Sequence, residues 1–244
     1  PTQLESYAKC PWAYFSSRLL GVETHEDPDD EMDAATVGTV YHKALQRFYD
    51  AEVTRQGGPV LLLAADLPGA TERLLVSLDA VLAEMDDTSW LGNPVMAGAK
   101  RMELRRTLTR YLAFEAETNR KLLGTHHTNV RIVRTAVARH EVEIREAILE
   151  RHGVRIRYRG TVDRVEIGID ERVTTGPYVA AVDYKTSKYG APGGGKKQAW
   201  DEGVVLQAPL YAHALGSIHP DAVVSRLEYR AIRQREVVQR LQLR

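Results

Sequence analysis

The stretch VAAVDYKTS, residues 179–187, joins an apolar run to an acid and a lysine. Its first four residues are small or β-branched, which predicts a strand inside a sheet. Side chains two positions apart on a strand face the same way. Asp183 and Lys185 are therefore expected to point together, and Tyr184 the opposite way. A solvated surface pair is the alternative, but a strand this apolar has reason to end in charges only if those charges serve a site.

A second acid belongs to the preceding predicted strand. The segment GTVDRVE, residues 160–166, holds Asp163 near the middle of an alternating run. If the two strands pair, Asp163 lies beside Asp183, and two such carboxylates repel unless a cation sits between them. Oxygen ligands suit Mg²⁺ or Mn²⁺, which can polarise a phosphate oxygen and activate a water. Lys185 can orient or deprotonate that water, or stabilise developing charge. These residue types suit phosphodiester hydrolysis.

The rest of the chain predicts helices first and strands later. Residues 1–125 are mainly helical by apolar spacing, with an apolar side on the first helix at Leu4, Tyr7, Ala8, Trp12 and Phe15 and on the next at Val37, Val40, Tyr41, Ala44, Leu45 and Phe48. Pro11 is expected to divide the first helix. Residues 130–244 predict three strands, a helix that contains Pro209, and late strands. The order βββαβ indicates an α+β fold with a helical N-terminal part wrapped on a central sheet.

Bulk composition sets few limits on function. The chain has 244 residues and a formal net charge of zero, which neither supports nor excludes nucleic-acid binding. One cysteine excludes an internal disulfide framework and predicts a reducing, cytoplasmic setting. No apolar run approaches the ~20 residues of a membrane helix, and the start lacks a signal-peptide pattern. The absence of an initial methionine is compatible with a piece of a longer protein.

Four pieces of the sequence together resemble a known family. They are SYAKCPWAYFSSRLLGV (6–22), GTVYHKAL (38–45), the two acidic strands, and LQAPLYAHAL (206–215). In this order they resemble the PD-(D/E)XK nuclease superfamily, and within it the RecB/AddB-type exonuclease domain and the related CRISPR adaptation nucleases. The resemblance spans nearly the whole chain. It implies a single nuclease domain over residues 1–244, with a restriction-endonuclease-like mixed sheet and a metal-dependent deoxyribonuclease activity that uses Mg²⁺ or Mn²⁺.

The resemblance also implies roles for individual residues. The implied metal ligands are His42, Asp163, Asp183 and the backbone carbonyl of Tyr184. Lys185 becomes the catalytic lysine, while Gln207 and Tyr211 support the site or contact the DNA backbone.

The residues themselves leave alternatives beside these roles. Gly38 lies one helical turn before His42, where a glycine allows another backbone to approach closely; a core or surface histidine is the alternative. Gln207 and Tyr211 share a helix face. Their alternative is a core tyrosine beside a surface glutamine.

Three charged neighbours of the acidic strands are expected to have other roles. Arg164 should face away from Asp163 and form an ion pair with a nearby acid. Glu141 or Glu143 could reach the site, although alternating charges more often form a solvated face.

Cysteine content separates this chain from many relatives that the resemblance suggests. Many of them hold an iron–sulfur cluster on four cysteines. Cys10 matches the first of these, and the chain has no other cysteine. No cluster can form in this chain alone. Either the further cysteines lie beyond Arg244, or the cluster has been lost, and in the second case Cys10 is expected to be a small buried residue.

DNA is the expected partner, entering a groove between the helical part and the sheet. The candidate basic contacts, for which ordinary surface charge is the alternative, are Lys188, Lys196, Lys197, Arg101, Arg105 and Arg106. A fused or associated helicase, and a role in recombinational repair, follow from the resemblance. The rival functions are a DNA-binding module without turnover and a structural partner in a larger complex, which predicts an exposed apolar face.

Overall fold

The computed structural model describes residues 2–22, 32–85, 94–124, 126–127, 130–170, 177–187 and 206–242. The helices are α1 (Thr2–Lys9), α2 (Pro11–Tyr14), the π-helical turn η1 (Phe15–Leu19), α3 (Ala34–Gln56), the 3₁₀ turn η2 (Ala64–Asp66), α4 (Leu67–Ala83), α5 (Pro94–Gly124) and α6 (Gln207–Ile218). The strands are β1 (His126–His127), β2 (Val130–Arg151), β3 (Val154–Asp170), β4 (Tyr178–Lys185), β5 (Val223–Ala231) and β6 (Glu236–Gln242).

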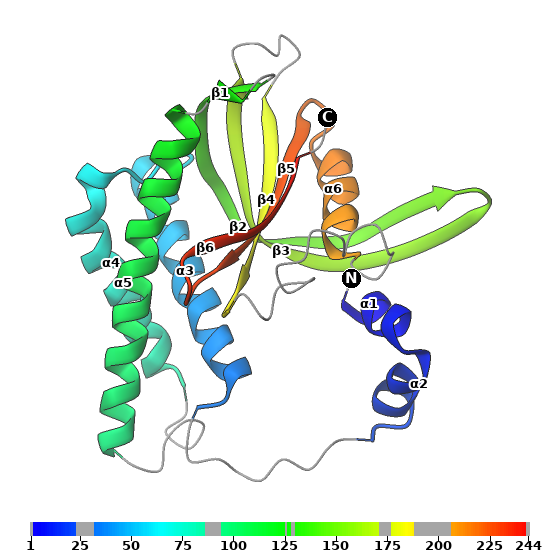
Figure 1. The fold of residues 1–244 in the computed structure, drawn as a ribbon, viewed down its shortest axis with the longest axis horizontal. Coiled ribbons are helices and arrows are strands. Elements are labelled where there is room, and N and C mark those ends of the chain that lie inside the picture. Colours follow the sequence, from blue (N-terminus) through cyan, green and yellow to red (C-terminus); the bar gives the residue numbers. More distant parts are fainter. Residues whose placement is uncertain are drawn as a thin grey trace.

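These strands form one mixed sheet within the described residues. They lie in the order β1-β2-β3-β4-β5-β6. The pair β4–β5 is parallel and the other pairs are antiparallel. A parallel pair needs a crossover connection, and α6 lies in the segment that makes it (Figure 1). The predicted α+β order, with strands β2, β3 and β4 before α6 and β5, is confirmed.

Strand β4 has the interior position that its apolar sequence predicts. It lies between β3 and β5, and its residues are buried from Tyr178 to Tyr184. Val182 and Tyr184 join a core with α3, α4 and α5 on one face of the sheet. Val179 and Ala181 join a second core with α6 on the other face. Figure 1 shows the three long helices on one side of the sheet and α6 on the opposite side.

Strands β2 and β3 form a long hairpin. Its turn, His152–Gly153, has φ angles of 50° and 76°, the left-handed values of a two-residue hairpin turn. The end of the hairpin projects away from the rest of the sheet (Figure 1). Helix α3 packs with the face predicted from its apolar spacing. The residues of that face are all buried: Val37, Val40, Tyr41, Ala44, Leu45 and Phe48.

The N-terminal segment corrects two expectations. Its predicted division at Pro11 is confirmed, but its apolar side is exposed, with Tyr7 at 56% and Trp12 at 71% relative accessibility. The physical reason is that no helix packs over that side within the described residues, where Leu4 is the apolar contact to the α6 core. Cys10 is likewise exposed rather than buried. Its Sγ accepts the Ala13 N–H at 3.4 Å and so caps α2.

Across the described residues, no helix combines the length and the apolar character needed to cross a bilayer.

Candidate active site

The site begins where strands β3 and β4 separate. Their paired register ends at Arg164 and Val182, so the next facing positions are Asp163 and Asp183. There Asp163 Oδ2 accepts the backbone N–H of Tyr184 at 2.7 Å. The carboxylate takes a hydrogen bond from the neighbouring strand just beyond the ladder. The structure therefore brings the two acids together at the middle of the sheet.

Asp183 is held by two side chains that face it on the α6 side of the sheet. Its Oδ1 accepts a hydrogen bond from Gln207 Nε2 at 2.8 Å, and its Oδ2 lies 2.6 Å from Lys185 Nζ. Asp183 is only 5% exposed. Burial raises the pKa of Asp183, and the charge and hydrogen bond of Lys185 act against that rise. Asp183 and Lys185 thus point the same way, as the strand pattern predicts.

Tyr184 faces the opposite side of the sheet with its ring and the site with its backbone. Its hydroxyl accepts a hydrogen bond from Arg164 at 3.1 Å inside the α3–α5 core. Its carbonyl oxygen lies 3.2 Å from Nε2 of His42. One residue therefore anchors the strand in the core and offers a carbonyl oxygen to the site.

His42 reaches the acids from helix α3. Its Nδ1 lies 3.6 Å from Asp163 Oδ2. Burial lowers the pKa of His42, so the ring favours the neutral form, which is the form that binds metals.

Gly38 explains how closely α3 approaches the end of β4. A Cβ at this position would lie 2.9 Å from Thr186 Oγ1. The close approach expected at Gly38 exists, but it is made by a threonine side chain and not by backbone. The absence of a Cβ therefore lets the helix that carries His42 sit beside the strand that carries Asp183.

Helix α6 supplies a buried hydrogen-bonded pair. Gln207 Nε2 donates to Tyr211 Oη at 2.9 Å, and Tyr211 Oη donates to the carbonyl oxygen of Thr161 at 2.5 Å. Both side chains are buried, so Gln207 is not the surface glutamine of the alternative. The amide of Gln207 also accepts from Lys185 Nζ and Tyr229 Oη, each at 3.4 Å. Gln207 therefore links Asp183, Lys185 and Tyr211.

Sequence reasoning missed Glu5. Its Oε1 accepts the backbone N–H groups of Leu206 at 2.8 Å and Gln207 at 2.7 Å. These donors belong to the first turn of α6, where helical N–H groups have no partner within the helix. Glu5 is 8% exposed. No local pattern could reveal this contact, because its partners lie 201 and 202 positions apart in the sequence.

The donor atoms fit an oxygen-rich divalent ion in their chemistry. They are one imidazole nitrogen, two carboxylates and one carbonyl oxygen, from His42, Asp163, Asp183 and Tyr184. Among the described residues, no three His, Cys, Asp or Glu side chains converge as a metal-binding group. Asp183 is engaged with Lys185 instead, and Asp163 with the Tyr184 N–H. The donor atoms are thus of the kinds that a divalent ion prefers, but in this structure the two carboxylates contact Lys185 and the Tyr184 N–H.

A comparison with protein families decides the classification. The model of the PD-(D/E)XK nuclease superfamily matches residues 1–243. The chain belongs to the PD-(D/E)XK nuclease superfamily. Its mixed sheet with N-terminal helices is accordingly the restriction-endonuclease-like fold.

A curated relative agrees with a RecB/AddB-type member of the superfamily. An ATP-dependent helicase/deoxyribonuclease subunit from Moorella thermoacetica is 29% identical over 220 residues. The match covers 90% of this PD-(D/E)XK chain and 18% of the relative. The chain therefore spans about a fifth of the length of that protein.

Behind the acids of this PD-(D/E)XK chain lies a buried network of charges. Arg164 contacts Glu115 and Glu166, which confirms its expected ion pairing on the face opposite Asp163. The network extends to further buried residues, Arg226, Glu228 and Arg230. These contacts lie within the sheet and its α5 side, so Arg164 is a structural residue.

The other acids considered from the sequence do not join the described site. Glu143 is exposed and lies 3.2 Å from Arg145, as expected for a solvated face. The side chain of Glu141 falls outside the described residues.

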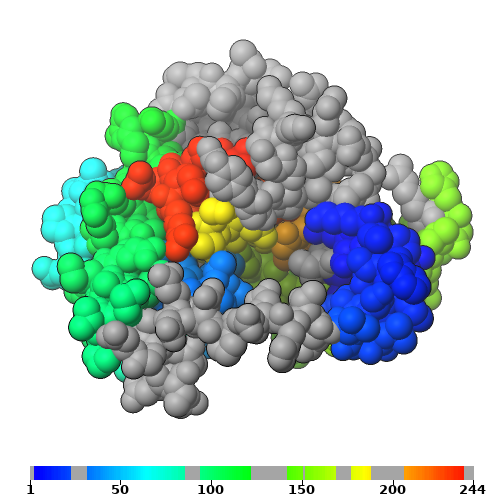
Figure 2. All heavy atoms as spheres, turned by 60° about the horizontal axis from the view of Figure 1, so that its bottom comes forward, coloured from blue at the N-terminus to red at the C-terminus, as the bar shows by residue number. Residues whose placement is uncertain are grey.

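Arginines of the PD-(D/E)XK chain line a hollow beside the strand that carries Asp183 and Lys185. The hollow has a volume of about 730 Å³ between α5 and the β5–β6 turn, and its arginines are Arg105, Arg106, Arg110, Arg233 and Arg235. The turn donates from the backbone N–H of Ile232 to the carbonyl of Lys185 at 2.9 Å. The hollow therefore adjoins the end of β4. Figure 2 shows α5 and the β5–β6 region next to β4 on this face.

The remaining predicted DNA contacts are placed as follows. Arg105 is paired with Asp79 at 2.6 Å and Arg101 is exposed. The lysines Lys188, Lys196 and Lys197 fall outside the described residues. The core around Val182 and Tyr184 lies between the helices and the sheet, and a hollow of about 450 Å³ opens on α3 with Gly38 and His42 in its lining.

Proposed function

We propose that this chain is a Mg²⁺- or Mn²⁺-dependent deoxyribonuclease that hydrolyses phosphodiester bonds. The observation that carries the proposal is the contact of Asp183 with Lys185 at 2.6 Å, next to Asp163 at the point where β3 and β4 part. Membership of a nuclease superfamily supports it. A buried carboxylate and a lysine in contact beside a second acid are the groups that metal-assisted phosphate hydrolysis requires.

Each residue then has a defined task. His42, Asp163, Asp183 and the Tyr184 carbonyl would hold the ion, which when bound supplies a Lewis acid and an activated water. Lys185 places a positive charge where negative charge develops, or accepts a proton from the attacking water. Gln207 holds Asp183 and Lys185 in one orientation through its two amide atoms. Tyr211 fixes Gln207 and ties it to β3.

The arginine hollow is the proposed phosphate contact. Arg106, Arg110 and Arg235 lie in it together with Arg105 and Arg233, which have the acidic partners Asp79 and Glu103. Contacts of this kind position a DNA strand without reading its sequence. They are also expected to make binding weaker as salt rises.

The wider setting is proposed from the named relative. That protein is a helicase/deoxyribonuclease subunit, so we propose that residues 1–244 act as one exonuclease domain beside a helicase, in recombinational DNA repair in the cytoplasm. The rival function is a module without turnover inside a larger complex. The exposed Tyr7, Trp12 and Phe15 favour that rival, because exposed apolar groups often mark contacts with partners.

End-labelled single-stranded and duplex DNA with Mg²⁺ or Mn²⁺ tests the proposal. Wild type should cleave, while Asp183→Asn and Lys185→Met should lose about 10²-fold or more. Asp183→Ala and Lys185→Ala extend the series by removing the side chains, whereas Asn and Met nearly keep their shapes. Glu143→Gln, an exposed acid on the hairpin, is the matched control and should cleave like wild type. Activity that survives loss of both Asp183 and Lys185 rules out this mechanism.

A further inference from the structure

A second hollow lies on the other side of the site from the arginines. It has a volume of about 530 Å³, within the ~300–1,000 Å³ range of small-molecule sites. Figure 2 shows α5 and the α1–α2 segment on opposite sides of β4. We call this hollow the tyrosine pocket, and it is lined by Gln3, Leu4, Tyr7, Tyr14, Arg157, Tyr158, Arg159, Gly160, Thr161 and Tyr211.

The tyrosine pocket is connected to the proposed catalytic groups by hydrogen bonds. Thr161 lies two positions before Asp163 on β3, and its carbonyl oxygen accepts a hydrogen bond from the Tyr211 hydroxyl. Tyr211 accepts from Gln207, which in turn donates to Asp183. The wall of the pocket is thus linked to the Asp183 carboxylate through the hydrogen-bonded side chains of Tyr211 and Gln207.

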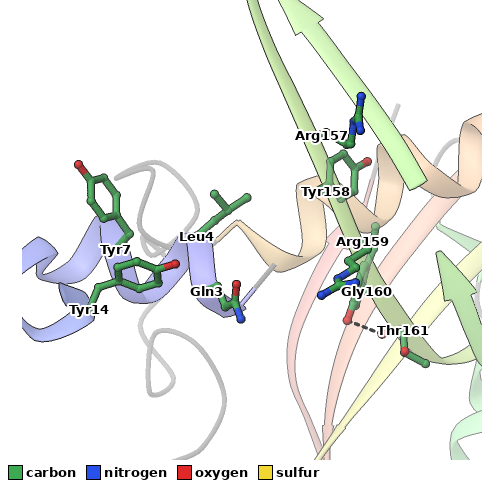
Figure 3. Close-up of a pocket in the computed structure, with 10 residues that line it drawn as sticks. Gln3, Leu4, Tyr7, Tyr14, Arg157, Tyr158, Arg159, Gly160 and Thr161 are labelled. Carbon is green, nitrogen blue, oxygen red and sulfur yellow. Dashed lines mark hydrogen bonds between the residues drawn. The ribbon is translucent and has the colours of Figure 1, made fainter. Parts of the chain in front are cut away.

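The two sides of the pocket carry different chemistry. Figure 3 shows Tyr7 and Tyr14 on the helical side and Arg157 and Arg159 on the strand side. The tyrosine rings meet edge to face with centroids 5.7 Å apart, and Tyr7 is 56% exposed. An edge-to-face pair leaves ring faces open for stacking. None of the described residues that line the pocket is acidic.

Arginine on the opposite side completes the match to a nucleotide. Arg157 and Arg159 are exposed, and Arg157 makes a surface pair with Glu146 at 3.1 Å. Such exposed ion pairs contribute little to stability, so a phosphate can replace Glu146 as the partner of Arg157. Aromatic faces beside arginines are the groups that bind single-stranded nucleic acid, because every base has a face that stacks.

We propose that the tyrosine pocket holds an unpaired base of a single DNA strand whose scissile phosphate lies at Asp163, Asp183 and Lys185. This inference rests on the proposed nuclease function. A duplex keeps its bases paired and stacked, so it cannot place a base face against Tyr7 or Tyr14 without unstacking, which costs a few kcal/mol. The pocket therefore selects single-stranded over duplex DNA next to the site.

The test uses the full chain in EDTA, so that DNA stays intact, and a short single strand containing 2-aminopurine, whose fluorescence falls on stacking. Wild type should bind with quenching. Tyr7→Leu combined with Tyr14→Leu should bind about 5- to 150-fold more weakly, which is the range for losing one stacked base. Tyr7→Phe, which keeps the ring, should bind like wild type.

Trp12→Leu is the matched control, because Trp12 is an aromatic residue of the same segment that is more exposed and does not line the pocket. It should leave binding unchanged within about two-fold. The inference fails if the double variant binds as tightly as wild type, if Trp12→Leu weakens binding equally, or if duplex binding depends equally on the two tyrosines. Thermal unfolding of each variant confirms that the chain is folded, and Tyr7→Leu alone serves if the double variant is not.

Cleavage by the same proteins in Mg²⁺ separates this inference from the proposed function. Tyrosine-dependent binding without any wild-type cleavage overturns the nuclease proposal and keeps the base-binding site. Cleavage of single strands that does not change in the double variant, together with unchanged binding, overturns the base-binding site and keeps the nuclease.

Discussion

At the scale of the residue, Glu5 joins two segments that lie far apart in the sequence. One carboxylate oxygen accepts two N–H groups at the start of α6 and thereby fixes the N-terminal helix to the helix of Gln207. A carboxylate at a helix N-terminus also interacts favourably with the helix dipole. Glu5 therefore holds Gln207 where it can donate to Asp183, without touching the acids itself.

Glu5→Ala is expected to lower the free energy of unfolding by about 1–3 kcal/mol, because it leaves one buried and one partly buried donor without an acceptor. Urea unfolding followed by circular dichroism measures the loss. Glu5→Gln retains an acceptor oxygen and should lose clearly less. Glu72, on the surface of α4, provides a control, since Glu72→Ala removes an acid without removing a cap. An equal loss in Glu5→Ala and Glu5→Gln would contradict the cap.

The proposed metal ligands give a second prediction at this scale. Mg²⁺ or Mn²⁺ at about 100 times its Kd should raise the free energy of unfolding by about 2.7 kcal/mol, because the ion binds only the folded chain. Asp163→Asn should remove this stabilisation while leaving the chain folded. Differential scanning calorimetry with and without EDTA measures both, independently of cleavage. Equal stabilisation of wild type and Asp163→Asn by the ion would show that Asp163 is not a ligand.

At the scale of the element, helix α3 can lie close to the end of strand β4 because Gly38 has no Cβ. The glycine leaves room for the Thr186 hydroxyl, and one turn later His42 faces the site. The geometry of the site thus depends on a helix-to-strand distance that one methyl group would change.

Gly38→Ala should destabilise the chain and reduce cleavage, because the new Cβ would stand 2.9 Å from Thr186 Oγ1. Gly98→Ala in α5 is the matched control, since a Cβ there meets nothing within 4 Å. That control should be stabilised by about 0.5–1 kcal/mol, as alanine is favoured over glycine within a helix. Thermal unfolding and cleavage rates check both variants. If Gly38→Ala gains stability like Gly98→Ala, the close approach does not constrain α3.

The elements also show what sequence could predict. The succession of helices and strands along the chain, the apolar face of α3 and the opposite orientations of Asp183 and Tyr184 follow from periodicity, which is local. The exposure of Tyr7 and Trp12 and the cap by Glu5 could not follow from it, because both depend on what other segments cover or contact. Pro209 did not prevent the predicted helix, since it stands in the first turn of α6, where its missing N–H costs little.

At the scale of the whole molecule, a layer of buried charge lies between the central strands and helix α5. Arg164, Glu166 and Glu115 join the central strands to α5, and Arg226, Glu228 and Arg230 extend the layer along β5. All six are nearly inaccessible. Buried charges of this kind are stable only as a complete set, because each depends on its partners to replace water.

Arg164→Ala should lower the free energy of unfolding by about 3–5 kcal/mol, because it leaves Glu115 and Glu166 buried beside a lost partner. Arg120→Ala is the control: Arg120 pairs with Glu117 on the surface of α5, and its loss should have little effect. Urea titration monitored by fluorescence measures both. Comparable stability of the two variants would mean that the buried layer is not held by its charges.

The crossover from β4 to β5 has a consequence for biosynthesis. A ribosome that has just finished β4 has already made His42, both acids and Lys185. Gln207 is translated only afterwards, and with it come the amide that contacts Asp183 and the backbone N–H that Glu5 binds. A nascent polypeptide therefore carries His42, both acids and Lys185 before it carries the amide that holds two of them, and the site is complete only when α6 packs against the strands and α1.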